Sequence, residues 1–118
     1  MQKILLVEDD AATAGFIEKF LLRNGYEVFH VSEGSRVLEV AKEFRPDLVL
    51  LDLMLPDLDG PSVQKKLLED EETKEIPIMV VTAHTQLEES FVDAANVVGF
   101  IAKPFGLEEF KKKIAAIF

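Results

Sequence analysis

The sequence contains no cysteine among its 118 residues. This absence excludes a disulfide-stabilised scaffold, a metal site built on thiolates and catalysis by a thiol. Long apolar runs are also missing, because the longest, residues 48–58, is interrupted by Asp52 and Asp57. A membrane span requires roughly 20 apolar residues, and the first residues do not resemble a signal peptide. We therefore expect a soluble, cytoplasmic protein that does not enter a membrane.

Basic residues are scarce: 13 Lys and Arg stand against 22 Asp and Glu, which gives a net charge of −9. A surface this negative repels phosphate backbones and anionic lipid headgroups. The glycine-rich phosphate-binding motifs G-x-G-x-x-G and the P-loop are absent as well. The composition therefore argues against direct binding to nucleic acid or to a membrane surface.

The chain has the length of one domain, and no linker, repeat or low-complexity tract divides it. We therefore expect a single domain over residues 1–118. Short apolar runs alternate with longer amphipathic segments along it. The runs predict strands at 4–7, 48–51, 76–81 and 99–102, and a segment rich in β-forming residues predicts another at 26–31. The amphipathic segments predict helices at 11–23, 35–44, 62–69, 87–95 and 107–118.

This alternation predicts an α/β fold, a doubly wound five-stranded parallel sheet with five helices. Strands that are apolar throughout are buried on both faces, as in a parallel sheet covered by helices. In the first helix, the stripe of Phe16, Ile17, Phe20 and Leu21 predicts the inward face. The other predicted inward positions are Val37, Leu38, Ala41, Val63, Leu67, Leu68, Phe110, Ile114 and Ile117.

Polar residues stand where the predicted strands end. Glu8, Asp9 and Asp10 follow the first strand, Asp52 the third, Thr82 the fourth and Lys103 the fifth. Since parallel strands end at one edge of the sheet, these groups would converge on one crevice. Carboxylates from different strands form an oxygen-rich site for a hard cation, typically Mg²⁺. One of them then becomes a plausible nucleophile toward a phosphoryl group.

Each of these residues also has a simpler interpretation. Asp52 could cap a helix or lie in a solvated turn, and Glu8 or Asp9 could cap the first helix. Asp10 fits such a cap well. Thr82 alone would be an ordinary strand residue, and Lys103 alone an ordinary surface lysine. His30, in an alternating strand, is predicted to be structural, and His84 is expected to be a solvated loop residue.

Four motifs together resemble a bacterial response-regulator receiver domain over essentially the whole chain. They are Glu8-Asp9, Leu50-Leu51-Asp52 with Pro56-Asp57-Leu58-Asp59-Gly60, Val81-Thr82-Ala83, and Lys103-Pro104-Phe105. The resemblance implies a flavodoxin-like receiver fold in a stand-alone, single-domain protein, with no output domain after Phe118. It further implies that Asp52 is the phosphoacceptor.

The resemblance also implies roles for the other site residues. Asp9 would bind Mg²⁺ directly and Glu8 through water, with Asp52 and the backbone carbonyl of Met54 as further ligands. Thr82 and Lys103 would contact the phosphoryl oxygens. A cis Lys103–Pro104 peptide would place the ammonium, and Phe100 would occupy the switch position with Thr82.

The implied function is two-component signalling. A sensor histidine kinase or a phosphotransfer protein would donate the phosphoryl group, and a downstream protein target or a phosphorelay would receive the signal. The chain would catalyse its own phosphorylation and dephosphorylation without being a conventional enzyme. Two alternatives remain: a phosphorylation-independent adaptor with a receiver fold, and a Mg²⁺-dependent phosphatase, against which the lack of a cap insertion argues.

Three features depart from the usual pattern of the family. The stretch Ala94-Ala95-Asn96-Val97-Val98 is one residue shorter than is common before the last strand. Phe100 has no hydroxyl, so a switch at this position would work by packing alone. Met54 and His84 occupy the variable positions two residues after Asp52 and Thr82, and the resemblance implies that residues at these positions tune the lifetime of the phosphoryl group.

Overall fold

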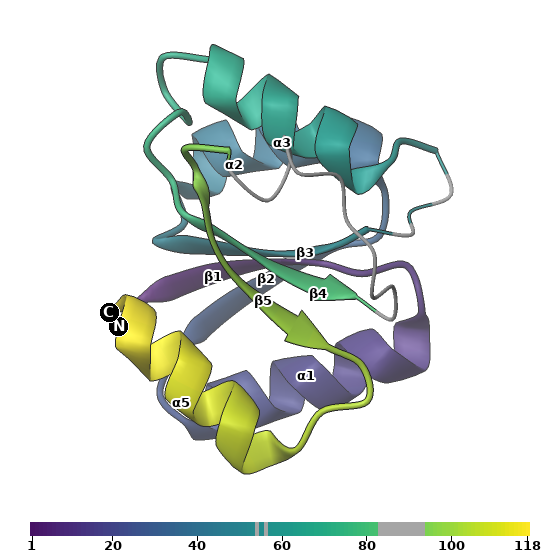
Figure 1. Ribbon diagram of the computed structural model, residues 1–118, viewed down its shortest axis with the longest axis vertical. Coiled ribbons are helices and arrows are strands. Elements are labelled where there is room, and N and C mark those ends of the chain that lie inside the picture. The colour runs from purple at the N-terminus through teal and green to yellow at the C-terminus, as the bar shows by residue number, and fades with distance from the viewer. Residues whose placement is uncertain (54, 56, 83–93) are drawn as a thin grey trace.

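The computed structural model describes residues 1–53, 55, 57–82 and 94–118 of the chain (Figure 1). Five short strands lie side by side in one parallel sheet. They are β1 (Lys3–Val7), β2 (Glu27–Val31), β3 (Leu48–Asp52), β4 (Ile78–Thr82) and β5 (Val97–Ala102). All five predicted strands are thus confirmed, with ends shifted by up to two residues. Pro77, predicted inside the fourth strand, instead precedes β4.

The described residues form four α-helices. These are α1 (Ala11–Arg23), α2 (Val37–Phe44), α3 (Gly60–Glu69) and α5 (Leu107–Ile117), and the 3-10 turn η1 (Gly34–Arg36) leads into α2. Most of the helix predicted over residues 87–95 lies outside the described residues. Its last two residues, Ala94 and Ala95, lie in the connection before β5 and are not helical, so the prediction is wrong at that end.

The strand order is β2-β1-β3-β4-β5, which is the flavodoxin-like arrangement of a doubly wound sheet. Figure 1 shows α2 and α3 covering one face of the sheet and α1 and α5 covering the other. After β2 has been added on one side of β1, the chain crosses to the other side and adds β3. A crevice opens at such a reversal, beyond the carboxyl ends of β1 and β3. The fold thus predicts where a site should lie.

Two apolar cores, one on each face, hold the helices to the sheet. Successive side chains of a strand point to opposite faces. Leu5 and Val7 of β1 therefore join the core under α2 and α3, whereas Ile4 and Leu6 join the core under α1 and α5. All four side chains are buried. Strand β1 consequently has little freedom to shift, and Glu8, which directly follows it, is held in a fixed position.

Helix α1 shows why one predicted core residue is wrong. Ala14, Ile17 and Leu21 are buried against the sheet, whereas Phe16 is 56% exposed. One residue corresponds to a turn of about 100° around a helix, so Phe16 cannot share the buried face with Ile17 and Leu21. Phe20 lies at the margin of that face and packs on Phe110, with ring centroids 5.8 Å apart.

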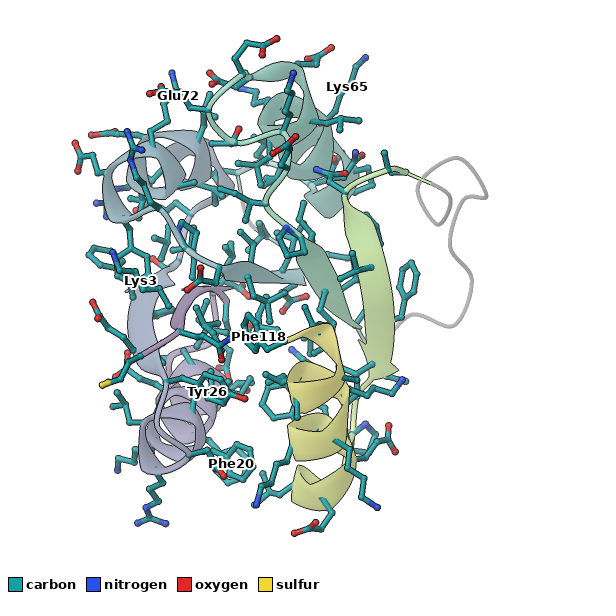
Figure 2. The ribbon with its side chains drawn as sticks, turned by 90° about the vertical axis from the view of Figure 1, so that its left-hand side faces the viewer. Lys3, Phe20, Tyr26, Lys65, Glu72 and Phe118 are labelled. Carbon is teal, nitrogen blue, oxygen red and sulfur yellow. The ribbon has the colours of Figure 1, made fainter. Side chains whose placement is uncertain are left out.

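The other helices largely confirm the predicted inward positions. Val37, Ala41, Val63, Leu67, Phe110 and Ile114 are buried, whereas Leu38, Leu68 and Ile117 are half-buried. Figure 2 shows Phe20, Tyr26 and Phe118 on the side of the sheet that carries α1 and α5. Among the described residues, no helix combines the length and apolar character needed to cross a bilayer.

Candidate functional site

The site lies at the carboxyl ends of the strands. Asp52 is the last residue of β3 and Thr82 the last residue of β4, while Glu8 and Lys103 directly follow β1 and β5. Strands β1, β3, β4 and β5 are consecutive neighbours in the sheet and run parallel. The strand ends therefore bring together residues that are far apart in the sequence, as the sequence predicted.

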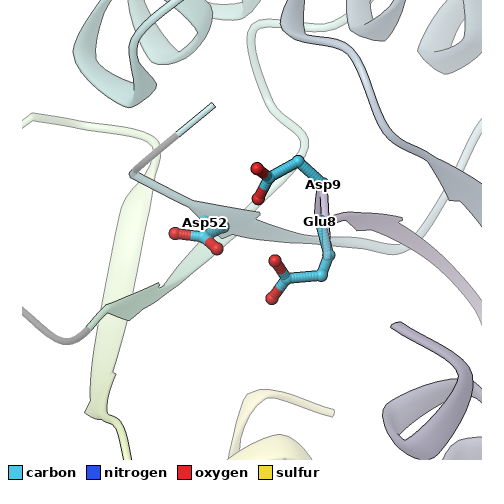
Figure 3. A group of neighbouring side chains, drawn as sticks. All are labelled: Glu8, Asp9 and Asp52. Carbon is cyan, nitrogen blue, oxygen red and sulfur yellow. The ribbon is translucent and has the colours of Figure 1, made fainter. Parts of the chain in front are cut away.

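Three carboxylates form the centre of the site (Figure 3). One oxygen from each of Glu8, Asp9 and Asp52 lies within 4.8 Å of the others. Glu8 and Asp52 are 2% and 6% exposed, whereas Asp9 faces solvent. Asp9 therefore leaves the cluster open on one side, from which an ion or a phosphoryl donor can approach.

Lys103 supplies the positive charge of this cluster. Its ammonium Nζ lies 2.8 Å from Oε1 of Glu8 and 3.1 Å from Oδ2 of Asp52. Its backbone N–H donates to the carbonyl of Thr82 at 2.8 Å, which fixes the start of the loop after β5 against the end of β4. The Lys103–Pro104 peptide is cis, as the resemblance implied.

The surroundings shift the pKa of two of these groups. Burial raises the pKa of Glu8, and the hydrogen bond with Asp52 raises it further against the opposing effect of Lys103. Burial opposes the charged form of Lys103, but its hydrogen bonds to Glu8 and Asp52 prevail and raise its pKa. Lys103 is thus held as a cation at the centre of the site.

Asp10 does not belong to the carboxylate cluster. It is the N-cap of α1, where its Oδ2 accepts the backbone N–H of Thr13 at 2.9 Å. Its own N–H donates to Oε2 of Glu8 at 3.2 Å. The prediction of a cap is therefore confirmed, and the cap also helps to orient Glu8 toward Lys103.

His30 contributes a contact that the sequence did not reveal. Its Nε2 lies 2.7 Å from the backbone carbonyl of Glu8, next to β1. The structural role predicted for His30 is therefore consistent with the fold, but its partner could only be known once the register of β1 and β2 was known, which pairs His30 with Leu6. The contact holds the backbone from which the Glu8 carboxylate extends.

The two predicted switch residues lie on neighbouring strands. Thr82 is buried at the end of β4. Phe100 is half-buried in β5 and packs against the core under α2 and α3. The backbone carbonyl of Phe100 accepts a hydrogen bond from Lys113 of α5 at 2.7 Å. Met54 and His84, the other two positions singled out in the sequence, lie outside the described residues.

The donor set suits a hard divalent cation. All three side chains offer carboxylate oxygens, the ligands that Mg²⁺ prefers. When ionised, the three carboxylates exceed the single ammonium of Lys103 by two charges (three minus one). A divalent cation would balance this excess, so the residues present fit Mg²⁺.

Comparison with known families and proteins agrees with this geometry. The sequence model described as the response regulator receiver domain matches residues 4–115. The polar-differentiation response regulator DivK of Brucella anthropi is 31% identical over 96% of this chain and 93% of its own length. The DNA-binding dual master transcriptional regulator RpaA of Synechocystis is 34% identical over 99% of this chain. The chain spans only 49% of RpaA.

Solved structures show the same fold. The receiver domain of the sensor histidine kinase PA1611 from Pseudomonas aeruginosa is 32% identical, with a TM-score of 0.86 over 98% of this chain and 95% of its own. That structure holds a magnesium ion in its active site cleft. The chemotaxis response regulator CheY4 of Vibrio cholerae is 27% identical, with a TM-score of 0.90 over 100% of this chain and 99% of its own.

Proposed function

Since the chain belongs to the family of response regulator receiver domains, we propose that it receives a phosphoryl group on Asp52 in a Mg²⁺-dependent reaction. The observation that carries the proposal is the convergence of Glu8, Asp9, Asp52 and Lys103 at one edge of the sheet. The donor would be the phosphohistidine of a sensor histidine kinase or of a phosphotransfer protein.

Asp52 is the nucleophile in this proposal. One carboxylate oxygen attacks phosphorus and forms the new P–O bond, while the P–N bond of the donor breaks. The imidazole leaves with the electron pair of that bond and takes up a proton. Asp52 suits this role because it ends a buried strand and its Oδ2 already lies 3.1 Å from a cation, Lys103.

The other residues would hold the metal and the phosphoryl oxygens. Asp9, Asp52 and the backbone carbonyl of Met54 would bind Mg²⁺ directly and Glu8 through water. When bound, Mg²⁺ would neutralise the negative charge that the phosphoryl oxygens carry. Lys103 would move from its contact with Asp52 to a phosphoryl oxygen, and the hydroxyl of Thr82 would donate to another.

Phosphorylation would then change the affinity for a downstream protein, or the phosphoryl group would pass on in a phosphorelay. We place the output at Thr82 and Phe100, because they lie on the neighbouring strands β4 and β5. A shift of Thr82 toward the phosphoryl group would alter the packing of Phe100. The reaction would take place in the cytoplasm, with no role for nucleic acid or membrane in the site itself.

The phosphorylation-independent adaptor is the less favoured alternative. An adaptor needs the fold but has no need of a nucleophile, a hard-cation donor set and a half-buried ammonium in contact with one another. The described residues place Glu8, Asp52 and Lys103 in such contact. A phosphatase acting on small molecules would need a substrate-binding cap, for which the sequence offers no insertion.

Phosphorylation of Asp52 can be tested directly. The protein is incubated with acetyl phosphate and Mg²⁺, and its intact mass is measured. Wild type should gain one phosphoryl group and Asp52→Asn should gain none. Asp10→Asn is the matched control, because Asp10 is a nearby carboxylate outside the cluster and this variant should still be labelled. Equal labelling of wild type and Asp52→Asn would reject the proposal, and no labelling of wild type would favour the adaptor.

A further inference from the structure

The loop that follows β3 is tied to a distant part of the chain by Asp57. The backbone N–H of Gly34 donates to Oδ1 of Asp57 at 2.9 Å, and the N–H of Ser35 donates to Oδ2 at 3.1 Å. One carboxylate thus accepts two hydrogen bonds from η1, more than 20 residues earlier in the sequence. We call this arrangement the Asp57 clip.

The same loop is closely packed on either side of the clip. Gly60 donates its N–H to the carbonyl of Leu53 at 3.3 Å, which closes the loop between β3 and α3. A side chain on Gly60 would come within 3.0 Å of Cα of Leu53. A side chain on Gly34 would come within 2.9 Å of Cβ of Leu58. The two glycines therefore let the loop and η1 approach more closely than other residues would.

We propose that Asp57 is a positioning residue for the cation site: its two hydrogen bonds anchor the end of the β3–α3 connection on η1, and this anchor favours Mg²⁺ binding next to Asp52. This rests on the proposed function, because the loop begins directly after the phosphoacceptor and contains Met54 in the sequence. Without the clip, Asp57 would be free to leave η1, and any part of the binding free energy used to return it there would reduce the Mg²⁺ affinity.

The chemistry of Asp57 agrees with this role. Hydrogen bonds from the side chain and the backbone of Ser35 lower its pKa, so Asp57 is a carboxylate at neutral pH and an acceptor for both N–H groups. Hydrogen bonds to an ionised acceptor are stronger than those between neutral groups. Asp57 itself is exposed and is not one of the three clustered carboxylates, so it acts on the ion only through the loop.

Coupling between two sites is reciprocal. If the clip strengthens Mg²⁺ binding, Mg²⁺ must strengthen the clip by the same factor. The amides of Gly34 and Ser35 should therefore exchange with solvent more slowly when Mg²⁺ is present. A residue that merely stabilised the fold would also lower the stability on removal, but Mg²⁺ would then slow the exchange of these two amides no more than that of other protected amides.

The experiment measures Mg²⁺ affinity by calorimetry and amide exchange at Gly34 and Ser35, with and without Mg²⁺. The variants are Asp57→Ala, which removes both acceptors, and Asp57→Asn, which keeps one. Asp70→Ala is the matched control. Asp70 is also a carboxylate that links two parts of the chain, since it contacts Lys42 of α2 at 2.9 Å, but it lies at the far end of α3.

We expect Asp57→Ala to weaken Mg²⁺ binding by about threefold to tenfold, the usual size of such couplings. Asp57→Asn should fall between it and wild type, and Asp70→Ala should leave the affinity unchanged. Mg²⁺ should slow the exchange of the two amides in wild type and in Asp70→Ala. Two results would overturn this inference and leave the proposed function standing. One is an unchanged Mg²⁺ affinity in Asp57→Ala. The other is a wild type that binds Mg²⁺ without any change in amide exchange at Gly34 and Ser35. A wild type that binds no Mg²⁺ would overturn the proposed function as well.

Discussion

Glu8 and Asp9 are adjacent in the sequence, yet the structure gives them different environments. Glu8 is buried and already shares a cation, Lys103, whereas Asp9 is exposed and points into the cluster from the solvent side. An incoming ion must compete with Lys103 for Glu8. These environments support the proposal that Asp9 binds Mg²⁺ directly and that Glu8 binds it through water.

The two acids should therefore differ in their effect on Mg²⁺ affinity. Loss of a group that orients a ligand without touching the metal typically costs about 10–100-fold in affinity. We expect Glu8→Gln to fall in that range and Asp9→Asn to cost more, because it removes a directly bound oxygen. Calorimetric titration of each variant with Mg²⁺ measures both effects. Asp10→Asn serves as the control, and a larger loss in Glu8→Gln than in Asp9→Asn would reverse the assignment.

At the scale of residues, the sequence predicted which groups converge but not how each is held. Asp52, Thr82 and Lys103 could be identified because each follows an apolar strand, and the order of a parallel sheet brings such residues together. The contact of His30 with the carbonyl of Glu8 depends on the register of two strands. No pattern in a single sequence encodes that register.

Among the elements, helix α3 begins directly after the loop that carries the clip. Asp59 is its N-cap, and the backbone N–H of Ser62 donates to Oδ1 of Asp59 at 2.8 Å. Pro61 lies in the first turn of the helix, where a backbone N–H would have no acceptor within the helix. The cap and the proline together fix where the loop ends and the helix starts.

The cap should make a stability contribution that depends on pH. Hydrogen bonds from the side chain and backbone of Ser62 lower the pKa of Asp59 below its ordinary value of 3.8. The contribution is therefore complete above that value and is lost as the pH falls through the lower pKa of the folded state. We expect Asp59→Ala to lower the free energy of unfolding by about 1 kcal/mol at neutral pH. Urea unfolding of the variant and of wild type, repeated at decreasing pH, should show the difference shrinking below 3.8.

Asp59→Asn provides the control for this prediction. Asn is as good an N-cap as Asp but has no carboxyl to titrate. Its stability at neutral pH should lie close to that of wild type, and it should lack the pH-dependent part. If Asp59→Ala and wild type differed by the same amount at every pH, the ionised carboxylate would not be the group that caps α3.

Elements were predictable where their apolar pattern is regular and less so where polar residues are buried. Gln64 of α3 is only 7% exposed, and its Nε2 donates to Oδ1 of Asn96 at 2.8 Å. Nδ2 of Asn96 donates in turn to the carbonyl of Gln64 at 3.2 Å. Each side chain has a partner more than 30 residues away, so neither could be assigned to the core from local periodicity.

At the scale of the whole molecule, the fold could be predicted because several independent features of the sequence agreed. The five strand segments, the helices between them and the polar residues at the strand ends all indicate one doubly wound sheet. The Asp57 clip was not predicted, because Asp57 has the sequence signature of an ordinary turn acid. Its partners are backbone N–H groups of a distant turn. Nearly every residue carries such a group, so the sequence does not indicate which of them Asp57 contacts.

The net charge of −9 makes the stability of the whole molecule sensitive to any cation, so a specific Mg²⁺ effect must be separated from screening. An ion that binds only the folded state stabilises it by an amount set by its concentration relative to Kd. At ten times Kd this amounts to about 1.4 kcal/mol, which should raise the Tm of a domain of this size by about 5 °C.

Differential scanning calorimetry with MgCl₂, and with NaCl at the same ionic strength, distinguishes the two effects. We expect the Tm of wild type to rise more with MgCl₂ than with NaCl. In Asp9→Asn the two salts should raise the Tm equally, by the amount that NaCl produces in wild type. Equal shifts from the two salts in wild type would mean that the negative surface alone responds and that the three carboxylates do not form a metal site.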